Sequence, residues 1–214
     1  MQEIYLIDVI PFLYLEENTF KELVIKFHNY LLLNNIDMLT SCNVSIHLFT
    51  KNYNFIEELS KYNVHIDRDF NDFNDIVNIV SDNPNNSKFI LFSNTIGISK
   101  DEIEKLNELL QYEENQIILG KNEEYISFLM TNAYTKDIFE NVSVIPVLYD
   151  IIIQNLNLTN SKIEIINNQQ LFFNENDINK LYQFLTTKEN KKYCPDHIYE
   201  HFTNLFIELK ELQK

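Results

Sequence analysis

The chain has 214 residues and carries 17 Lys plus Arg against 32 Asp plus Glu, which gives a formal net charge of −15. Hydrophobic residues make up 45% of the chain and aromatic residues 13%. This composition excludes intrinsic disorder and supplies a core for one ordinary domain. An acidic surface repels phosphate, so we expect no nucleic-acid partner and no binding to an anionic membrane.

No apolar run approaches the roughly 18 residues that a membrane-spanning helix needs. The first residues lack the basic region and cleavage site of a signal peptide. Cys42 and Cys194 are too few to build a disulfide framework. We therefore expect a cytoplasmic protein without a membrane span.

The first part of the chain alternates short apolar runs with amphipathic segments. A strand is predicted at residues 4–10, then a helix from about Asn18 with apolar residues at helical spacing. Strands at 44–49 and 64–66 follow, with helices predicted around residues 55–59 and over 73–80. Pro84, Asn85 and Asn86 are expected to end the last of these helices.

The central part has the clearest signals. Residues 89–92 form a continuous apolar run, typical of a central strand that is covered on both faces. After a loop at residues 93–98, Ser99 and Glu102 form a capping-box pattern for a helix with an apolar stripe. That stripe is expected to contain Ile103, Leu106, Leu109 and Leu110. Strands are predicted at 116–119 and 125–130, with Gly120 as a turn residue between them.

The rest of the chain continues the alternation, with a helix at 147–156, a strand at 163–166 and a helix at 176–185. This order predicts an α/β fold with a mostly parallel sheet and helices on both faces. Residues 188–192 form a charged linker to a helix over 195–212, whose stripe contains Ile198, Phe202, Leu205, Phe206 and Leu209. We thus expect a domain at 1–187 and, at 188–214, a helix that packs on it or forms a homodimer contact.

Several segments carry a family resemblance, namely residues 91–96, 118–121, 122–130, 144–146, 171–174 and 177–178. Their order resembles the GT-A nucleotide-diphospho-sugar transferase superfamily over roughly residues 4–187. More narrowly, it is similar to the uncharacterised glycosyltransferase-like group that includes DUF2064. The resemblance implies a Rossmann-like α/β/α fold, a sugar-nucleotide donor and a divalent metal.

The chain departs from that family where the chemistry is expected. Asn94 stands where GT-A enzymes have a metal-binding aspartate, and an amide oxygen is a weaker, uncharged ligand. Residues 11–17 replace a glycine- and arginine-containing phosphate loop, and include Glu16 and Glu17 but no basic residue. The paired glycines are replaced by Tyr125 and Ile126. These losses imply a retained fold with an eroded donor site.

The resemblance assigns candidate roles to five residues. Glu123 and Glu124 match the family's acidic pair and are the candidate catalytic residues. Ser93, Asn94 and Thr95 follow the central strand and are the candidate cofactor-binding residues. Sugar nucleotide and divalent metal are expected only if the family activity survives. Two function classes remain: a transferase with an altered site, and a catalytically silent binding or assembly module.

Other groups of polar residues have structural interpretations. Cys194, His197 and His201 could hold a transition metal, since the two histidines lie one helical turn apart, but solvated side chains are the favoured interpretation. The acidic run at residues 67–75 is interpreted as a charged surface loop. His28 and His47 lie within apolar segments and are expected to be packing or surface residues. We assign no metal-ligand set.

Overall fold

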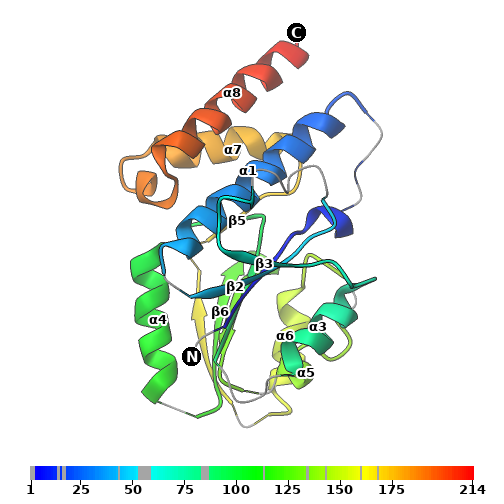
Figure 1. Cartoon of the computed structure of the whole chain (residues 1–214), viewed down its shortest axis with the longest axis vertical. Helices are drawn as coiled ribbons and strands as arrows, with labels where there is room; N and C mark the ends of the chain where they lie inside the picture. Colours follow the sequence, from blue (N-terminus) through cyan, green and yellow to red (C-terminus); the bar gives the residue numbers. More distant parts are fainter. Residues whose placement is uncertain are drawn as a thin grey trace.

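The computed structural model describes residues 3–13, 15, 18–42, 44–52, 59–82, 87–112, 114–133, 135–142, 144–159, 161–167 and 169–214. Within them a seven-stranded sheet has the order β3-β2-β1-β4-β7-β6-β8 (Figure 1). Only β7 runs antiparallel to its neighbours. The expected α/β fold with a mostly parallel sheet is therefore confirmed. The strands are β1 (Glu3–Ile7), β2 (Ser45–Phe49), β3 (Val64–Asp67), β4 (Lys88–Phe92), β6 (Gln116–Asn122), β7 (Tyr125–Thr131) and β8 (Lys162–Ile166).

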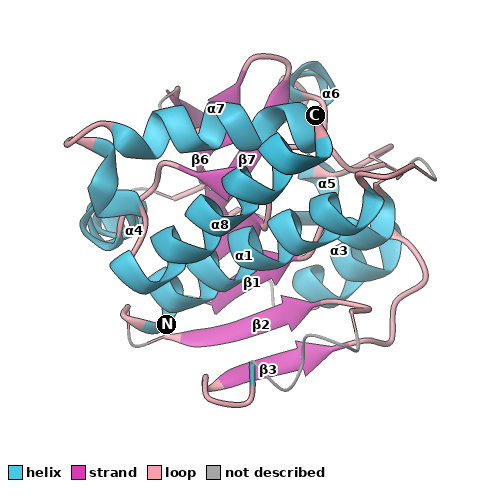
Figure 2. Cartoon of the chain, turned by 90° about the horizontal axis from the view of Figure 1, so that it is seen from above, coloured by secondary structure: helices cyan, strands magenta, loops and turns pink. Residues whose placement is uncertain are grey.

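Helices cover both faces of this sheet. On one face are α1 (Lys21–Thr40), α4 (Lys100–Tyr112), α7 (Glu175–Thr186) and α8 (Asp196–Leu212), and α1, α7 and α8 lie over the strands in Figure 2. On the other face are α3 (Phe73–Ser81), α5 (Thr135–Ile138) and α6 (Tyr149–Leu156). A hydrophobic core lies on each face of the sheet, and strand β1 contributes side chains to both. Ile4 and Leu6 pack in one core, and Tyr5 and Ile7 pack in the other.

Strand β4 is the centre of the sheet, with β1 on one side and β7 on the other. All five of its residues are buried. The prediction that residues 89–92 form an inner strand is confirmed. An unbroken apolar run is stable here because both of its faces meet packed side chains.

The capping residue predicted for α4 is in place, whereas the one predicted for α1 is not. The Ser99 amide and hydroxyl both donate to Glu102 Oε2, each at 2.7 Å, so the predicted capping box before α4 is present. The stripe on that helix is narrower than predicted, since Leu109 is 41% exposed. Helix α1 begins at Lys21 rather than Asn18. Asn18 instead accepts a hydrogen bond from the Phe20 amide at 2.9 Å, just before the helix.

Gly120 is not a turn residue, so that prediction is wrong. Strand β6 continues through it to Asn122, with a register shift between Gly120 and Lys121. A side chain at Gly120 would overlap the Phe128 ring and the Ser127 hydroxyl, so the position requires glycine for close packing rather than for chain reversal.

Two other boundaries differ from expectation. Strand β1 ends at Ile7, and the 3₁₀ helix η1 (Ile10–Phe12) follows with Pro11 in its first turn. The predicted loop at 93–98 contains β5 (Thr95–Ile96), which pairs with β9 (Gln170–Leu171). The predicted helix at 55–59 and the stop at Pro84 to Asn86 lie outside the described residues, Leu59 excepted.

The C-terminal helix α8 packs on α1 and α7 of the same chain, after the 3₁₀ helix η3 (Asn190–Tyr193). The Phe27 and Phe202 rings meet edge to face with centroids 6.2 Å apart, and Tyr182 stacks on Phe206 at 4.2 Å. Lys26 donates to Glu208 at 2.8 Å. The apolar stripe of the helix is thus covered within one copy of the chain. No helix in the described part of the chain combines the length and apolar character required to cross a bilayer.

Phe202 and Ile207 provide a matched test of this packing. Phe202 is 2% exposed against α1, whereas Ile207 on the same helix is 51% exposed. We expect Phe202→Ala to lower the free energy of unfolding by about 3–5 kcal/mol, because it leaves a cavity. Ile207→Ala should change it by about 0.5 kcal/mol or less. Urea unfolding measures both, and equal losses would contradict the packing described.

Candidate functional site

The strand order reverses between β1 and β4, since β2 and β3 extend to one side of β1 and the later strands to the other. In open α/β sheets, ligands bind beyond the carboxyl ends of the strands at such a point. Here those ends lead into Asp8 after β1 and Ser93 after β4. This edge of the sheet is where a donor nucleotide is expected.

Asp8 places a buried carboxylate at the switch point, which is the place where the strand order reverses. Its exposed fraction is 0%, and Thr50, which follows β2, donates its hydroxyl to Asp8 Oδ2 at 2.6 Å. The Ile10 amide donates to Oδ1 at 3.1 Å. Burial raises the pKa of Asp8 to about 6, although both hydrogen bonds favour the charged form and limit the rise. Sequence analysis missed this residue because it follows an apolar run without any motif.

The neighbouring strand end, after β4, carries Ser93, Asn94 and Thr95. These residues are 0%, 2% and 0% exposed. The Ser93 hydroxyl accepts the Val9 amide at 3.1 Å, which closes the gap between the ends of β1 and β4. The Thr95 hydroxyl donates to the Ser127 carbonyl at 3.0 Å. Asn35 of α1 donates to the carbonyls of Ser93 and Thr95 at 2.9 and 3.0 Å. The side chains of Ser93 and Thr95 are therefore engaged inside the protein.

These residues do not fit a divalent ion held against a diphosphate. Such an ion needs anionic oxygen ligands that are open to the substrate. Asn94 offers only an uncharged side-chain amide and is buried, and its main-chain carbonyl accepts the Phe172 amide at 3.1 Å. The family's metal role therefore has no matching donor set at the end of β4.

Glu123 and Glu124 form the tight turn between β6 and β7, and both are exposed. Glu123 has a left-handed backbone, with φ of 51°, and the Glu124 carbonyl accepts the Tyr149 amide at 2.8 Å. Both residues line a pocket of about 270 Å³ together with Lys121 and Tyr149. The turn lies at the same sheet edge as Ser93 to Thr95, but the latter residues are buried and the glutamates are in solvent.

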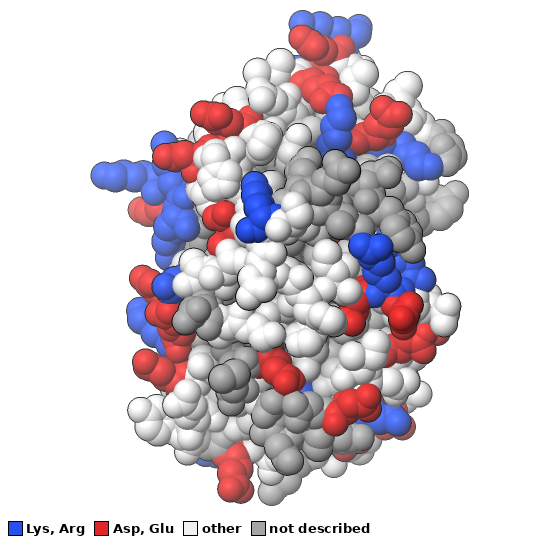
Figure 3. Space-filling model, viewed as in Figure 1, with Lys and Arg blue, Asp and Glu red and all other residues white. Residues whose placement is uncertain are grey.

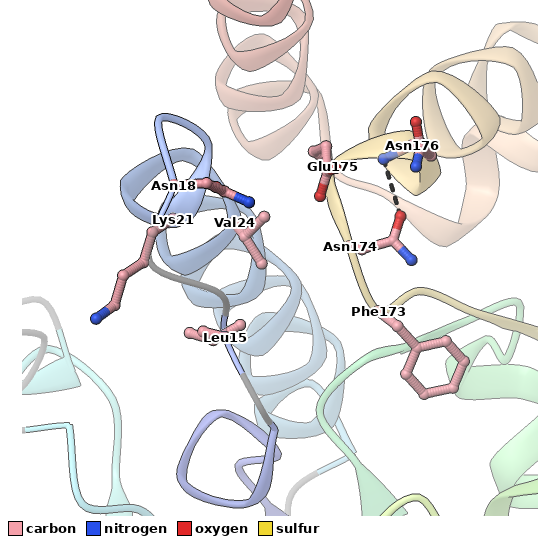
Figure 4. A pocket seen from close by; sticks show the side chains of 8 residues that line it. All are labelled: Leu15, Asn18, Lys21, Val24, Phe173, Asn174, Glu175 and Asn176. Atoms are coloured by element: carbon pink, nitrogen blue, oxygen red, sulfur yellow. Dashed lines mark hydrogen bonds between the residues drawn. The ribbon is translucent and has the colours of Figure 1, made fainter.

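A second pocket, of about 280 Å³, lies between the start of α1 and the start of α7. Figure 4 shows Leu15, Asn18 and Val24 on the α1 side, opposite Asn174 and Glu175 on the α7 side, while the Lys21 side chain extends away from α7. Phe173 and Asn176 complete the lining. Sequence analysis did not identify this pocket, because its two walls are separated by about 150 positions of chain.

Two of the asparagines that line this pocket cap nearby backbone amides. The side-chain oxygen of Asn18 accepts the Phe20 amide, and that of Asn174 accepts the Asn176 amide at 3.0 Å. Their oxygens are thereby occupied by the backbone, which leaves the NH₂ groups as hydrogen-bond donors.

His28 joins the two walls of the pocket. Its Nε2 lies 3.1 Å from the Phe173 carbonyl, and Nδ1 is buried with no hydrogen-bond partner. Burial lowers the pKa of His28 to about 4. Of the two roles expected for His28, packing or surface, the structure shows the packing role.

The possible metal set of Cys194, His197 and His201 is not assembled. The Cys194 thiol is buried and directed to the Pro195 carbonyl at 3.7 Å, and burial raises its pKa to about 12. His197 approaches Asp37 at 3.7 Å, whereas His201 stacks on Tyr30 at 4.5 Å. The three side chains therefore serve separate contacts.

Comparison with solved structures identifies the fold. A protein from Desulfovibrio desulfuricans assigned as a nucleotide-diphospho-sugar transferase matches 98% of this chain and 97% of its own, with a TM-score of 0.74 and 9% identity. The 4-diphosphocytidyl-2C-methyl-D-erythritol synthase of Anaerococcus prevotii matches 87% of this chain and 96% of its own, with a TM-score of 0.55 and 12% identity. A cytidylyltransferase from Leptospira borgpetersenii matches 99% and 94%, with a TM-score of 0.52 and 11% identity.

No protein-family model matches the sequence, and no curated protein matches it either. At these identities the structural matches establish the fold and not the activity. The chain has the GT-A-like fold of nucleotide-diphospho-sugar transferases and cytidylyltransferases.

The raised pKa of Asp8 predicts a specific pH dependence of stability. The unfolded carboxyl ionises near its usual pKa of 3.8, while the folded one ionises at about 6. Between these values the folded state binds more protons, so the contribution of Asp8 to stability falls as pH rises, by about 3 kcal/mol in total. Asp8→Asn is nearly isosteric and removes this slope.

Urea unfolding of wild type and Asp8→Asn between pH 4 and pH 7 measures the effect as a difference. The difference is needed because burial lowers the pKa of His28, so the contribution of His28 to stability rises with pH between about 4 and about 6.5, opposite to that of Asp8. His28 is present in both proteins, so its contribution cancels in the difference. A difference that does not change with pH would show that Asp8 is not buried as described.

Proposed function

We propose that the chain is a catalytically silent binding module that retains the GT-A-like fold. The observation that carries the proposal is the closed switch point, where Asp8 is fully buried and the Ser93 hydroxyl is bonded to the Val9 amide. A donor nucleotide would have to displace these bonds to reach the strand ends. A site that is occupied by the protein's own buried polar groups has no room for a substrate diphosphate.

Charge at this edge also argues against a diphosphate ligand. The segment after β1, from Asp8 to Phe20, contains the 3₁₀ helix η1 but neither a glycine nor a basic residue. Glu123 and Glu124 add negative charge at the neighbouring turn. On the face shown in Figure 3, Lys and Arg are interspersed with Asp and Glu rather than gathered into a patch. An anionic ligand would be repelled by a chain of net charge −15.

The pocket between α1 and α7 is the better candidate for a ligand site. Its lining mixes amide, charged and apolar residues: Asn18, Asn174, Asn176, Lys21, Glu175, Leu15, Val24 and Phe173. Amide and charged groups beside apolar side chains suit a ligand with several hydroxyl groups. We infer that a free sugar or similar polyol is the class of ligand.

A second candidate function is a transferase with an altered site, in which Glu123 and Glu124 act as general base or ligands and Ser93, Asn94 and Thr95 contact the nucleotide. One observation favours it: Tyr125, next to this turn, meets Phe173 of the pocket with ring centroids 5.5 Å apart. The acidic pair is therefore close to the candidate ligand pocket. The silent module remains favoured because the nucleotide side of such a site is buried.

We propose kinship with the glycosyltransferase-like group that includes DUF2064, a cytoplasmic location, and no nucleic-acid partner. A homodimer through α8 would use Ile207 and Leu212, the exposed apolar residues of that helix.

Asn94→Asp separates the two functions, since it restores the carboxylate of the family. We expect uridine and guanosine diphosphate with Mn²⁺ to bind wild type with Kd of about 1 mM or weaker, equivalent to about −4 kcal/mol. The variant should bind no better, because position 94 is buried. Calorimetry measures binding, and release of nucleoside diphosphate from sugar nucleotides measures turnover. Micromolar nucleotide binding, or turnover that Glu124→Gln abolishes, would establish the transferase instead.

Asn176 provides the test of the ligand class. It is exposed at the pocket, and Asn176→Ala keeps the backbone amide that Asn174 caps. We expect free hexoses at millimolar concentration to show saturation-transfer NMR signals with wild type and weaker signals with this variant. Asn78→Ala, at an exposed position on α3, is the matched control and should leave the signals unchanged. Equal signals from all three proteins would contradict a sugar site in this pocket.

A further inference from the structure

Three potential metal ligands meet on the edge strands β2 and β3, away from the pocket described above. His47 of β2 and His65 of β3 are register partners in a parallel pair. Asp67 follows His65 by two positions and therefore projects from the same face of the sheet. Figure 2 shows these two strands at one edge of the sheet, β3 outermost. The ladder itself brings the three side chains together.

The distances between the ligand atoms match a coordination sphere. His65 Nε2 lies 3.3 Å from Asp67 Oδ1, and His47 Nδ1 lies 3.5 Å from Asp67 Oδ2. One ligand atom from each residue lies within 4.8 Å of the others. Two atoms bound to zinc at about 2.1 Å and at tetrahedral angles are about 3.4 Å apart. A small shift of the side chains would therefore suffice to admit an ion.

One carboxylate oxygen of the cluster is buried without a hydrogen bond. Asp67 Oδ2 is inaccessible to solvent and accepts no hydrogen bond. A carboxylate oxygen that loses its water without gaining a donor is destabilising, and a cation offsets that cost. His65 has a side chain that is 64% exposed, so an ion has a path to the cluster from solvent.

The surroundings hold the ligands in place. The Tyr5 ring of β1 stacks on His47 with centroids 5.3 Å apart, and His65 meets His47 edge to face at 5.2 Å. The Thr50 amide donates to the Asp67 carbonyl at 3.2 Å, which fixes the backbone of the carboxylate ligand. Ligands on paired strands lose little freedom when a metal binds, which favours affinity.

We propose that His47, His65 and Asp67 bind one divalent ion of the zinc class. Two imidazoles and a carboxylate suit Zn²⁺, Co²⁺ or Ni²⁺, whereas Mg²⁺ and Ca²⁺ prefer oxygen ligands alone. Three protein ligands leave the fourth position open to water or an external group. The site is independent of the proposed function, since it shares no residue with the sugar pocket or the closed switch point.

This site was not expected from the sequence, in which His47 was interpreted as a packing or surface residue and Asp67 as part of a surface loop. The spacing of His65 and Asp67 places them on one strand face. Which residue of β2 faces them depends on the register of the β2–β3 pair, and the sequence does not specify that register.

The test is calorimetry of the full chain, free of any affinity tag, with ZnCl₂ alone. We expect one equivalent of Zn²⁺ with a micromolar Kd, weakened at least about tenfold in His65→Ala and in Asp67→Asn. His197→Ala is the matched control, because His197 also lies near a carboxylate and is 56% exposed. It should bind as wild type does. Co²⁺ should give the visible absorption of a tetrahedral complex in wild type and lose it in His65→Ala.

His65 is mostly exposed and Asp67→Asn is isosteric, so both variants should fold, and thermal melts verify that they do. Wild type that binds Zn²⁺ no better than millimolar would overturn the proposal. So would binding that is unchanged in both cluster variants, or that His197→Ala weakens as strongly as they do. Loss confined to the two cluster variants supports it.

Discussion

The burial of β4 on both faces is the constraint on which the rest of the molecule depends. All five residues of this strand are buried, with α1 and its neighbours on one side and α3, α5 and α6 on the other. Its four residues Phe89 to Phe92 are apolar on both faces, so the middle of the sheet is mostly apolar. The polar groups of interest lie away from that middle. The switch point lies at strand ends, the His47, His65 and Asp67 cluster on edge strands, and the pocket between the starts of α1 and α7.

At the carboxyl ends of β1, β2 and β4, polar groups of the chain are hydrogen-bonded to one another. Asp8 accepts bonds from Thr50 and Ile10, Ser93 accepts the Val9 amide, and Asn35 serves two carbonyls. A buried carboxylate with a raised pKa destabilises the folded state at neutral pH. Its bonds join the loops that follow β1 and β2. In this fold the same place usually receives a ligand, and here the polar groups that would meet one are bonded to each other.

Much of the fold could be predicted because its signals are local. The apolar run at 89–92 and the Ser99–Glu102 capping box each need only a few neighbouring residues, and both are present in the structure. The failures involve distant contacts. Gly120 was interpreted as a turn residue, but its small size is required by the Phe128 ring on the next strand. Leu109 was assigned to the buried stripe although its side of α4 faces solvent.

The candidate site was harder to predict for the same reason. Resemblance located Ser93, Asn94 and Thr95 at the end of the central strand, and they lie there. What the sequence could not supply was their burial, which depends on Asn35 of α1 and on Ser127 of β7. The pocket between α1 and α7 likewise needs two segments at opposite ends of the chain. Local patterns locate individual residues, whereas the site depends on which segments meet.

His47, His65 and Asp67 lie on the edge strands of the same sheet whose central strand ends are closed by internal hydrogen bonds. Edge strands are exposed to solvent on their outer side, so His65 can remain accessible while His47 and Asp67 are held by the ladder. The central strands cannot do this, because any polar group there is buried and must be satisfied internally. Thr50 connects the two regions: its amide binds the Asp67 carbonyl and its hydroxyl binds Asp8. Thr50 therefore contacts the backbone of one proposed ion ligand and the buried carboxylate at the switch point, while the three proposed ligands themselves lie outside that point.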